Sequence, residues 1–289
     1  MTFDVSLSNK SYEIYNIDPA VLHQVDEALY PYDTTWKRVG VNVSGGADSA
    51  VGTSILCELI EKHGNNTEVV FLTNVRVWNN RPWAAPISIE VYEKIKSMFP
   101  DVKMQRVQNF IPPEIEDGVI GIIEQINTSG DRICTQSFNR FAAYTYNLDA
   151  VYTFITNNPV VDSVPHHKGP ADRRWDEEKV IEEGVCPQFN PADSDRDPII
   201  VAPWKLISKE FIMGQYYRRG WEELLETTRS CEGDKVLFPD DFESYLTYQH
   251  GVSPLIECHQ LTDDINKQCY WCAERQWAKK EAKRILNAT

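Results

Sequence analysis

The sequence predicts an α/β protein with a doubly wound parallel sheet and a small helical C-terminal subdomain. Between residues 38 and 155, short runs rich in β-branched residues alternate with longer amphipathic segments. This alternation is typical of a parallel sheet with helices on both faces. A glycine-rich loop follows the first run, where such sheets bind ligands. Four of the seven cysteines lie in the last quarter of the chain, which marks a separate C-terminal unit.

Four strands are predicted from short β-rich runs. In the first run, 38–43, the alternating Val39, Val41 and Val43 indicate a strand with one buried face. The other predicted strands are 68–73, 103–107 and 150–155.

Helices are predicted where apolar residues recur at helical spacing. In 50–63 the apolar residues share one face, and Gly64 suits the position just after a helix. The other predicted helices are 87–99, stopped by Pro100; 113–147, broken near 129–130; 208–219; 221–227; and 272–286.

The same pattern divides the chain. Residues 1–36 are polar without a strand signal, and we expect an N-terminal arm. Residues 37–204 form the predicted α/β domain, and 205–289 the helical C-terminal subdomain. Within the α/β domain, periodicity disappears over 157–203, which is rich in proline, aspartate and histidine. A stretch of that length without periodicity indicates a substrate loop or lid.

Charge and hydropathy exclude several classes of protein. Acidic residues outnumber basic ones by 43 to 29, giving a net charge of −14. This argues against a nucleic-acid partner, because such binding neutralises phosphates with lysine and arginine. No apolar run approaches the roughly 18 residues of a membrane span, and the N-terminal residues lack signal-peptide features. We therefore expect a soluble, cytoplasmic protein without a membrane partner.

The glycine-rich loop has the residues of a phosphate-binding site. Gly45 and Gly46 let backbone N–H groups approach a ligand at the start of a helix. Ser44 and Ser49 add hydroxyl donors. Asp48 would repel phosphates unless a cation lies between them, and Mg²⁺ binds carboxylates and phosphates together. The alternative interpretation is an ordinary strand-to-helix turn.

The C-terminal cysteines have the spacing of a zinc site. Zinc prefers four tetrahedral ligands, and a C-x₂-C pair supplies two of them. The predicted ligands are Cys231, Cys258, Cys269 and Cys272. His259 and Cys186 are alternatives for the fourth ligand. A redox pair and buried cysteines without metal are the competing interpretations.

The loop Ser44-Gly-Gly-Ala-Asp-Ser49 resembles the SGGxDS motif of the PP-loop ATP pyrophosphatases, or adenine nucleotide α-hydrolases. The resemblance implies a Rossmann-like sheet of the PP-loop (HUP) type. It also implies that the loop holds the pyrophosphate part of ATP. Members of this superfamily cut ATP between the α and β phosphates or adenylate a substrate.

A narrower resemblance covers about half of the chain, at 38–64, 141–158 and 199–286. Residues 206–212, 224–231 and the Cys269/Cys272 knuckle are similar to the C-terminal third of 7-cyano-7-deazaguanine synthases, enzymes of queuosine biosynthesis. This implies a ligase that uses ATP, Mg²⁺ and a structural Zn²⁺, with Lys209 beside the phosphates or the acyl-adenylate. The implied substrates are a deazapurine acid, 7-carboxy-7-deazaguanine, and ammonia. The acid becomes an amide and then a nitrile, and the resemblance suggests a homodimer.

The sequence departs from that family at two places. Tyr270 and Trp271 stand where the family has Gly-Lys, and Cys258 lies upstream of the knuckle. The segment 74–78 replaces the family's Tyr-Gly-Gln motif. The resemblance therefore predicts the reaction with ATP better than it predicts the acceptor substrate. Two alternatives remain: another PP-loop enzyme for amidation or tRNA-base thiolation, and a catalytically silent nucleotide-sensing or partner-binding module.

Overall fold

The computed structural model describes residues 32–64, 66–75, 84–110, 130–156, 189–190, 199–204, 209–231 and 257–288. Its strands are β1 (Arg38–Asn42), β2 (Glu68–Val75), β3 (Met104–Phe110), β4 (Ala150–Tyr152), β5 (Phe189–Asn190) and β6 (Ile199–Val201). Its helices are α2 (Ala47–Lys62), α3 (Ala84–Met98), α5 (Gly130–Tyr146), α7 (Lys209–Arg219), α8 (Glu222–Thr227), α11 (Cys258–Leu261), the 3₁₀ helix η4 (Ile265–Lys267) and α12 (Tyr270–Ala288).

The strands form one sheet in the order β3-β2-β1-β4-β6-β5. Strands β3, β2, β1, β4 and β6 are parallel, and β5 pairs antiparallel with β6. Because the chain fills the sheet on one side of β1 and then returns to its other side, β1 and β4 flank the point where the strand order reverses. The predicted doubly wound α/β fold is confirmed, and its expected ligand position is the carboxyl end of β1.

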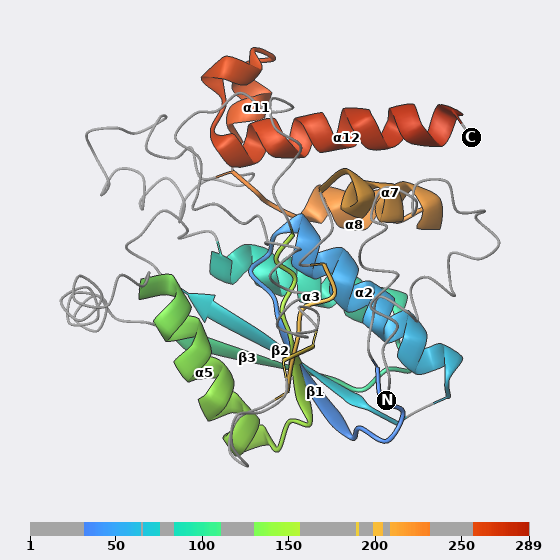
Figure 1. Cartoon of the computed structure of the whole chain (residues 1–289), viewed down its shortest axis with the longest axis vertical. Helices are drawn as coiled ribbons and strands as arrows, with labels where there is room; N and C mark the ends of the chain where they lie inside the picture. The colour runs from blue at the N-terminus through green and yellow to red at the C-terminus, as the bar shows by residue number, and fades with distance from the viewer. Residues whose placement is uncertain are drawn as a thin grey trace, which may run out of the picture.

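Helices cover both faces of the sheet (Figure 1). Alternate strand residues point to opposite faces, so Val39 and Val41 of β1 pack on the side of α2 and α3. Val70 and Leu72 of β2 pack instead against the buried side chains of α5. This alternation produces three layers with the sheet in the middle.

Helices α7, α8 and α12 add a further layer over α2, with α12 crossing at the top of Figure 1. Ile212 and Tyr216 of α7 are fully buried and belong to the same apolar cluster as Ile55 of α2. Ala278 of α12 joins that cluster. Since α2 is covered on both sides, it is buried along most of its length. The boundary at residue 204 stays a prediction.

Several predicted elements are found with shifted ends. Helix α2 begins at Ala47, three residues before the predicted start, because Gly46 occupies its N-cap. Gly64 follows the helix with a φ of 63°, as predicted. Residues 199–201, predicted as part of an irregular stretch, form β6 in the sheet. The N-terminal arm before residue 32, most of the stretch 157–198 and the predicted helix 113–129 lie outside the described residues.

Candidate functional site

The predicted phosphate loop joins the end of β1 to the start of α2 at the centre of the sheet. Gly45 has a φ of +82°, a left-handed conformation that favours glycine. A Cβ there would lie 2.8 Å from Ile87 Cγ2, so the site has no room for a side chain. A Cβ at Gly46 would have Ser44 Oγ at 3.4 Å and the Arg229 carbonyl at 3.7 Å as its nearest neighbours. The loop therefore keeps a narrow backbone cradle below the first turn of α2, whose N–H groups have no partner within the helix.

Two residues from the last third of the chain hold this loop. The Arg229 N–H donates to the Gly45 carbonyl at 2.9 Å. The Tyr216 hydroxyl donates to the Ala47 carbonyl at 2.5 Å. Burial raises the pKa of Tyr216 well above its ordinary value, so the hydroxyl stays protonated and remains a donor. The loop is thus fixed by backbone and side-chain donors that lie far away in the sequence.

Asp48 and Lys209, both predicted site residues, lie in direct contact. Lys209 Nζ donates to Asp48 Oδ2 at 2.6 Å, and its side chain is only 4% exposed. Asp48 Oδ1 is buried without a hydrogen-bond partner among the described residues. A carboxylate with one oxygen paired and the other buried without a partner fits a divalent cation better than a purely structural ion pair.

The two predicted serines take different positions. Ser49 is buried in the first turn of α2, and its hydroxyl donates to the Gly46 carbonyl at 3.1 Å. It therefore braces the loop. Ser44 is exposed at the loop entrance.

Glu274 is a site residue that the sequence analysis missed. It is fully buried on α12, and its Oε2 lies 3.8 Å from Lys209 Nζ. One signal was present in the sequence. Glu274 falls four and eight residues before Ala278 and Ala282, which are buried on the same face of α12. A carboxylate on an apolar helix face indicates a buried charged partner.

Three of the predicted metal ligands meet at the start of α12. The sulfur atoms of Cys231, Cys269 and Cys272 lie within 4.8 Å of one another. Two thiolates bound to one tetrahedral zinc ion at about 2.3 Å would lie about 3.8 Å apart, so the arrangement fits zinc after a small contraction. Cys258 begins α11, but its side chain lies outside the described residues, as does Cys186.

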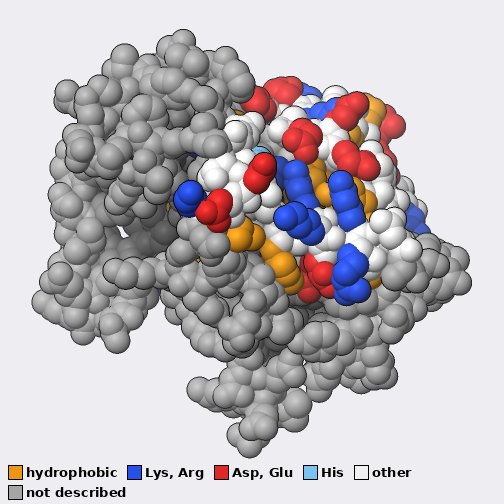
Figure 2. All heavy atoms as spheres, turned by 90° about the horizontal axis from the view of Figure 1, so that it is seen from above, with side chains coloured by type: hydrophobic (Ala, Val, Ile, Leu, Met, Phe, Trp, Pro, Cys, Tyr) orange, Lys and Arg blue, Asp and Glu red, His pale blue; other side chains and the backbone are white. Residues whose placement is uncertain are grey.

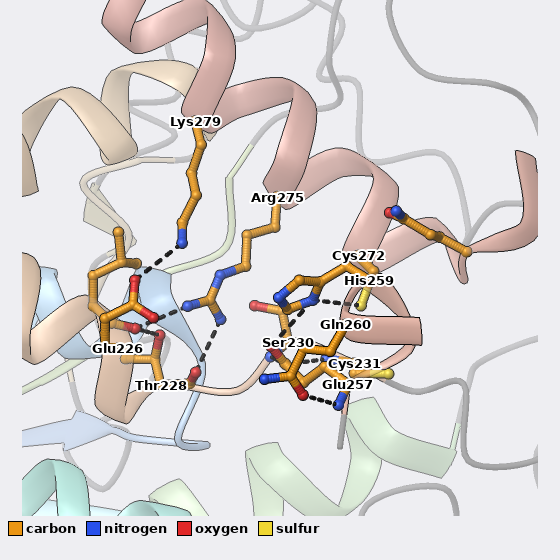
Figure 3. Close-up of polar contacts among 12 residues, drawn as sticks. Glu226, Thr228, Ser230, Cys231, Glu257, His259, Gln260, Cys272, Arg275 and Lys279 are labelled. Carbon is orange, nitrogen blue, oxygen red and sulfur yellow. Dashed lines mark hydrogen bonds and ion pairs between the residues drawn. The ribbon is translucent and has the colours of Figure 1, made fainter. Parts of the chain in front are cut away.

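The alternative fourth ligand, His259, lies beside this cluster (Figure 3). Its Nδ1 is 3.8 Å from Cys272 Sγ, and Glu257, His259 and Cys272 form a second group of candidate ligands. Burial, the largest influence, lowers the pKa of His259 despite the nearby carboxylate of Glu257. The neutral imidazole that burial favours is the form that binds metals.

Glu257 organises the backbone next to the cysteines (Figure 3). Its Oε1 accepts the N–H groups of Ser230 at 3.0 Å and Cys231 at 3.1 Å. Burial favours the neutral carboxyl group, but the positive charge of Arg275 and the Ser230 N–H outweigh it and lower the pKa of Glu257. The carboxylate is therefore charged and holds the loop that carries the first cysteine.

Arg275 fastens α12 to the end of α8. Its Nη1 donates to the Thr228 carbonyl at 2.9 Å, and its Nη2 to the Leu225 carbonyl at 2.8 Å. Both bonds are buried, and Figure 3 shows the guanidinium pointing at the segment 228–231. That segment carries Arg229, which binds the phosphate loop, and Cys231, which belongs to the cysteine cluster. The two parts of the site are therefore joined by a continuous stretch of backbone.

The outer surface above α12 carries both signs of charge. Figure 2 shows basic side chains interspersed with acidic ones on this face. On α12 itself, Lys279 pairs with Glu226 at 3.2 Å and Arg284 with Glu281 at 2.5 Å. None of the helices in the described ranges is both long and apolar enough to cross a membrane.

Comparisons with known proteins give structural similarity alone. No protein-family model matches the sequence, and no curated protein matches it significantly. One similar solved structure is the U34-tRNA thiolase NcsA from Methanococcus maripaludis with its [4Fe-4S] cluster, with a TM-score of 0.41 and 12% identity over 92% of this chain and 78% of that chain.

Two NAD⁺ synthetases are also similar. The enzyme from Burkholderia pseudomallei has a TM-score of 0.32 and 11% identity over 99% of this chain and 89% of its own. The glutamine-dependent enzyme from Acinetobacter baumannii, in complex with ADP, has a TM-score of 0.36 and 13% identity over 96% of this chain and 44% of its own. At these values the similarities assign neither a substrate nor a reaction. The chain is an α/β protein with five parallel strands, whose glycine loop and cysteine cluster are joined by residues 228–231.

Proposed function

We propose that this chain is an ATP-dependent ligase of the PP-loop type that adenylates a carboxylate or amide of a deazapurine and uses ammonia. The observation that carries the proposal is the Asp48–Lys209 pair, in which Lys209 of α7 contacts Asp48 beside the glycine loop at the carboxyl end of β1. The nucleotide half rests on this geometry. The acceptor rests on the resemblance to 7-cyano-7-deazaguanine synthases.

The loop backbone, Asp48 and Lys209 have separate tasks in this proposal. The first-turn N–H groups of α2 and the backbone at Gly45 and Gly46 bind the phosphate oxygens of ATP. Asp48 offers Oδ1, which has no hydrogen-bond partner among the described residues, to a magnesium ion. Bound Mg²⁺ supplies charge neutralisation at the phosphates. The Lys209 ammonium, buried beside Asp48, stabilises the negative charge that develops on the leaving pyrophosphate.

The proposed reaction combines this nucleotide site with the acceptor that the resemblance implies. A carboxylate oxygen of the acceptor attacks the α-phosphorus, the bond to the β-phosphate breaks, and pyrophosphate leaves. Ammonia then attacks the acyl carbon and AMP leaves, giving an amide. A second ATP then activates the amide oxygen with loss of pyrophosphate, and departure of AMP together with the two N–H protons gives the nitrile. The backbone cradle orients the phosphates throughout, and no side-chain nucleophile is required.

The buried ion pair supports a working site over a silent module. Burying Asp48 with Lys209 costs desolvation energy, and apolar residues of similar size would stabilise the fold at least as well. Lys209 lies among buried apolar residues of α7 such as Ile212 and Met213. A chain that only senses a partner has no need for this charged pair.

A structural metal at the cysteine cluster fits the same proposal. Cys231, Cys269 and Cys272 supply three thiolates, and Cys258 or His259 completes four ligands. A closed four-ligand site leaves no position for substrate, so zinc would hold the segment 228–231 against the phosphate loop. Metal analysis tests this: one zinc per chain is expected. Iron with acid-labile sulfide would favour the sulfur-transfer alternative, since Fe–S clusters are also bound by cysteine thiolates.

Product analysis with Mg²⁺-ATP, ammonium and 7-carboxy-7-deazaguanine tests the function. The expected result is AMP and pyrophosphate formed only with the acid present, together with a product whose carboxyl group has become a nitrile. Asp48→Asn and Lys209→Met should each lower the rate at least about 100-fold, because each removes charge stabilisation at the phosphates. Glu93→Gln, at an exposed position on α3, is the matched control and should have no effect.

The other outcomes distinguish the alternatives. AMP formation that does not depend on the acid keeps the PP-loop enzyme and replaces the acceptor. ADP and phosphate instead of AMP would contradict the adenylation chemistry. ATP binding without turnover, together with a function in cells that Asp48→Asn leaves unchanged, would favour the silent module.

A further inference from the structure

One buried ammonium lies between two carboxylates at the phosphate loop. Lys209 Nζ is 2.6 Å from Asp48 Oδ2 and 3.8 Å from Glu274 Oε2. The three residues come from α7, α2 and α12. The Lys209 and Glu274 side chains are 4% and 0% exposed, whereas Asp48 is 19% exposed. Asp48 is therefore the member that faces the ligand side, and Glu274 is the member behind it.

The position of Glu274 is connected to the cysteine cluster. The Tyr270 hydroxyl donates to Glu274 Oε1 at 3.4 Å. Tyr270 is the first spacer residue between Cys269 and Cys272, and it replaces the glycine of the family that the sequence resembles. Glu274 itself lies two residues after Cys272, in the same turn of α12. The knuckle and the carboxylate that faces Lys209 are therefore in direct contact through the Tyr270 hydroxyl.

From these contacts we infer that Glu274 is a positioning residue for Lys209, set in place by the cysteine cluster through Tyr270. This inference rests on the proposed nucleotide site. When Asp48 turns to a magnesium ion, Lys209 loses part of its counter-charge while it remains buried. An unpaired buried ammonium is costly, and Glu274 provides a second carboxylate that lowers this cost. Glu274 thereby releases Asp48 for the cation and keeps the ammonium directed at the phosphates.

The charges of these three side chains predict how ATP binding depends on Mg²⁺. With Glu274 present, the three side chains carry a net charge of −1, which attracts a cation. Without its charge, Lys209 depends on Asp48 alone and competes with Mg²⁺ for that carboxylate. The affinity for ATP in the absence of Mg²⁺ should not fall, because removing a negative charge from the site reduces repulsion of the phosphates. A merely structural role for Glu274 would instead weaken nucleotide binding under both conditions.

The test measures ATP binding to the full chain at increasing Mg²⁺ concentration, with calorimetry or a fluorescent ATP analogue as the detection method. Glu274→Gln should raise the Mg²⁺ concentration at half-saturation about tenfold, a usual size for coupling between sites. Tyr270→Phe keeps the carboxylate and loses only its hydroxyl contact, so a shift of about threefold in the same direction is expected. Glu281→Gln, on the same helix but paired outward with Arg284, is the matched control and should leave the titration unchanged.

Removal of the metal proposed for the cysteine cluster provides the second readout. Stripping metal from the cysteine cluster should shift the Mg²⁺ titration of the unmodified protein in the same direction. In Glu274→Gln the stripping should add no further shift, because the connecting carboxylate is already gone. Circular dichroism confirms that each variant is folded. If Glu274→Gln does not fold, Tyr270→Phe decides the question.

The outcomes separate this inference from the proposed function. An unmodified chain that does not bind Mg²⁺-ATP overturns both. Binding by the unmodified chain with an unchanged titration in Glu274→Gln and Tyr270→Phe overturns the positioning role alone. Equal loss of binding with and without Mg²⁺ in Glu274→Gln also overturns it, since that result identifies a structural role.

Discussion

Replacing Gly45 by alanine should destabilise the protein by more than a typical surface substitution. The φ of +82° is costly for a residue with a Cβ, by about 1–2 kcal/mol. The new Cβ would lie 2.8 Å from Ile87 Cγ2, 3.1 Å from Ile87 Cβ and 3.3 Å from the Ser88 nitrogen. The last two atoms belong to the rigid first turns of α3, so the helix must shift, at about 1–3 kcal/mol. The free energy of unfolding should therefore fall by about 2–5 kcal/mol.

Gly46→Ala is the matched control one residue later. Its N-cap φ is −81°, and its nearest neighbour would be Ser44 Oγ at 3.4 Å, an ordinary contact. The loss should stay below about 1 kcal/mol, which reflects alanine as a poorer N-cap than glycine. Urea denaturation followed by tryptophan fluorescence measures both variants. Equal losses, or a loss below about 1 kcal/mol for Gly45→Ala, would refute the argument that this position requires glycine.

Three further predictions concern the C-terminal contacts and the cysteines. Arg275→Met removes two buried, charge-assisted hydrogen bonds and should lower the free energy of unfolding by about 3 kcal/mol or more. Lys279→Met breaks an ion pair with a largely exposed carboxylate and should lower it by less than about 1 kcal/mol. Urea denaturation compares the two variants. Chelation of the metal proposed at the cysteine cluster should lower the melting temperature in differential scanning calorimetry, and added zinc should restore it, since metal binding contributes folding energy. An unchanged melting temperature after verified metal removal would contradict a structural site. Burial raises the pKa of the Cys57 thiol, so iodoacetamide at pH 8 should alkylate it only after unfolding. Modification of Cys57 in the native protein, measured by peptide mass, would contradict its place in the core.

Much of the sheet could be predicted because its strands are regular and its helices long. Alternating valines in 38–43 and the apolar face of 50–63 carry their periodicity in the sequence itself. The strand β6 has only three residues, too few for any alternation to be visible. Its place in the sheet follows from pairing with β4, a tertiary contact that local sequence does not encode.

The site could be predicted in its residue types more than in its contacts. Asp48 and the two loop glycines follow from the motif, and Lys209 follows from a resemblance. Their pairing could not be predicted, because 161 residues separate the two charged side chains. Glu274 was missed for a related reason, since its role depends on how α12 lies across α7. The cysteine spacing predicted three candidate ligands that the structure brings together, and it could not choose the fourth.

The supports of the phosphate loop also determine when the site can exist during synthesis. Lys209 and Tyr216 follow their loop partners by 161 and 169 residues. At about 5–20 residues per second, a ribosome needs roughly 10 to 30 s to reach them after making the loop. During that interval the nascent loop has neither its ammonium nor its tyrosine donor. The proposed nucleotide site is therefore complete only after α7 has been made, and two fragments divided between β6 and α7 would have to associate to form it.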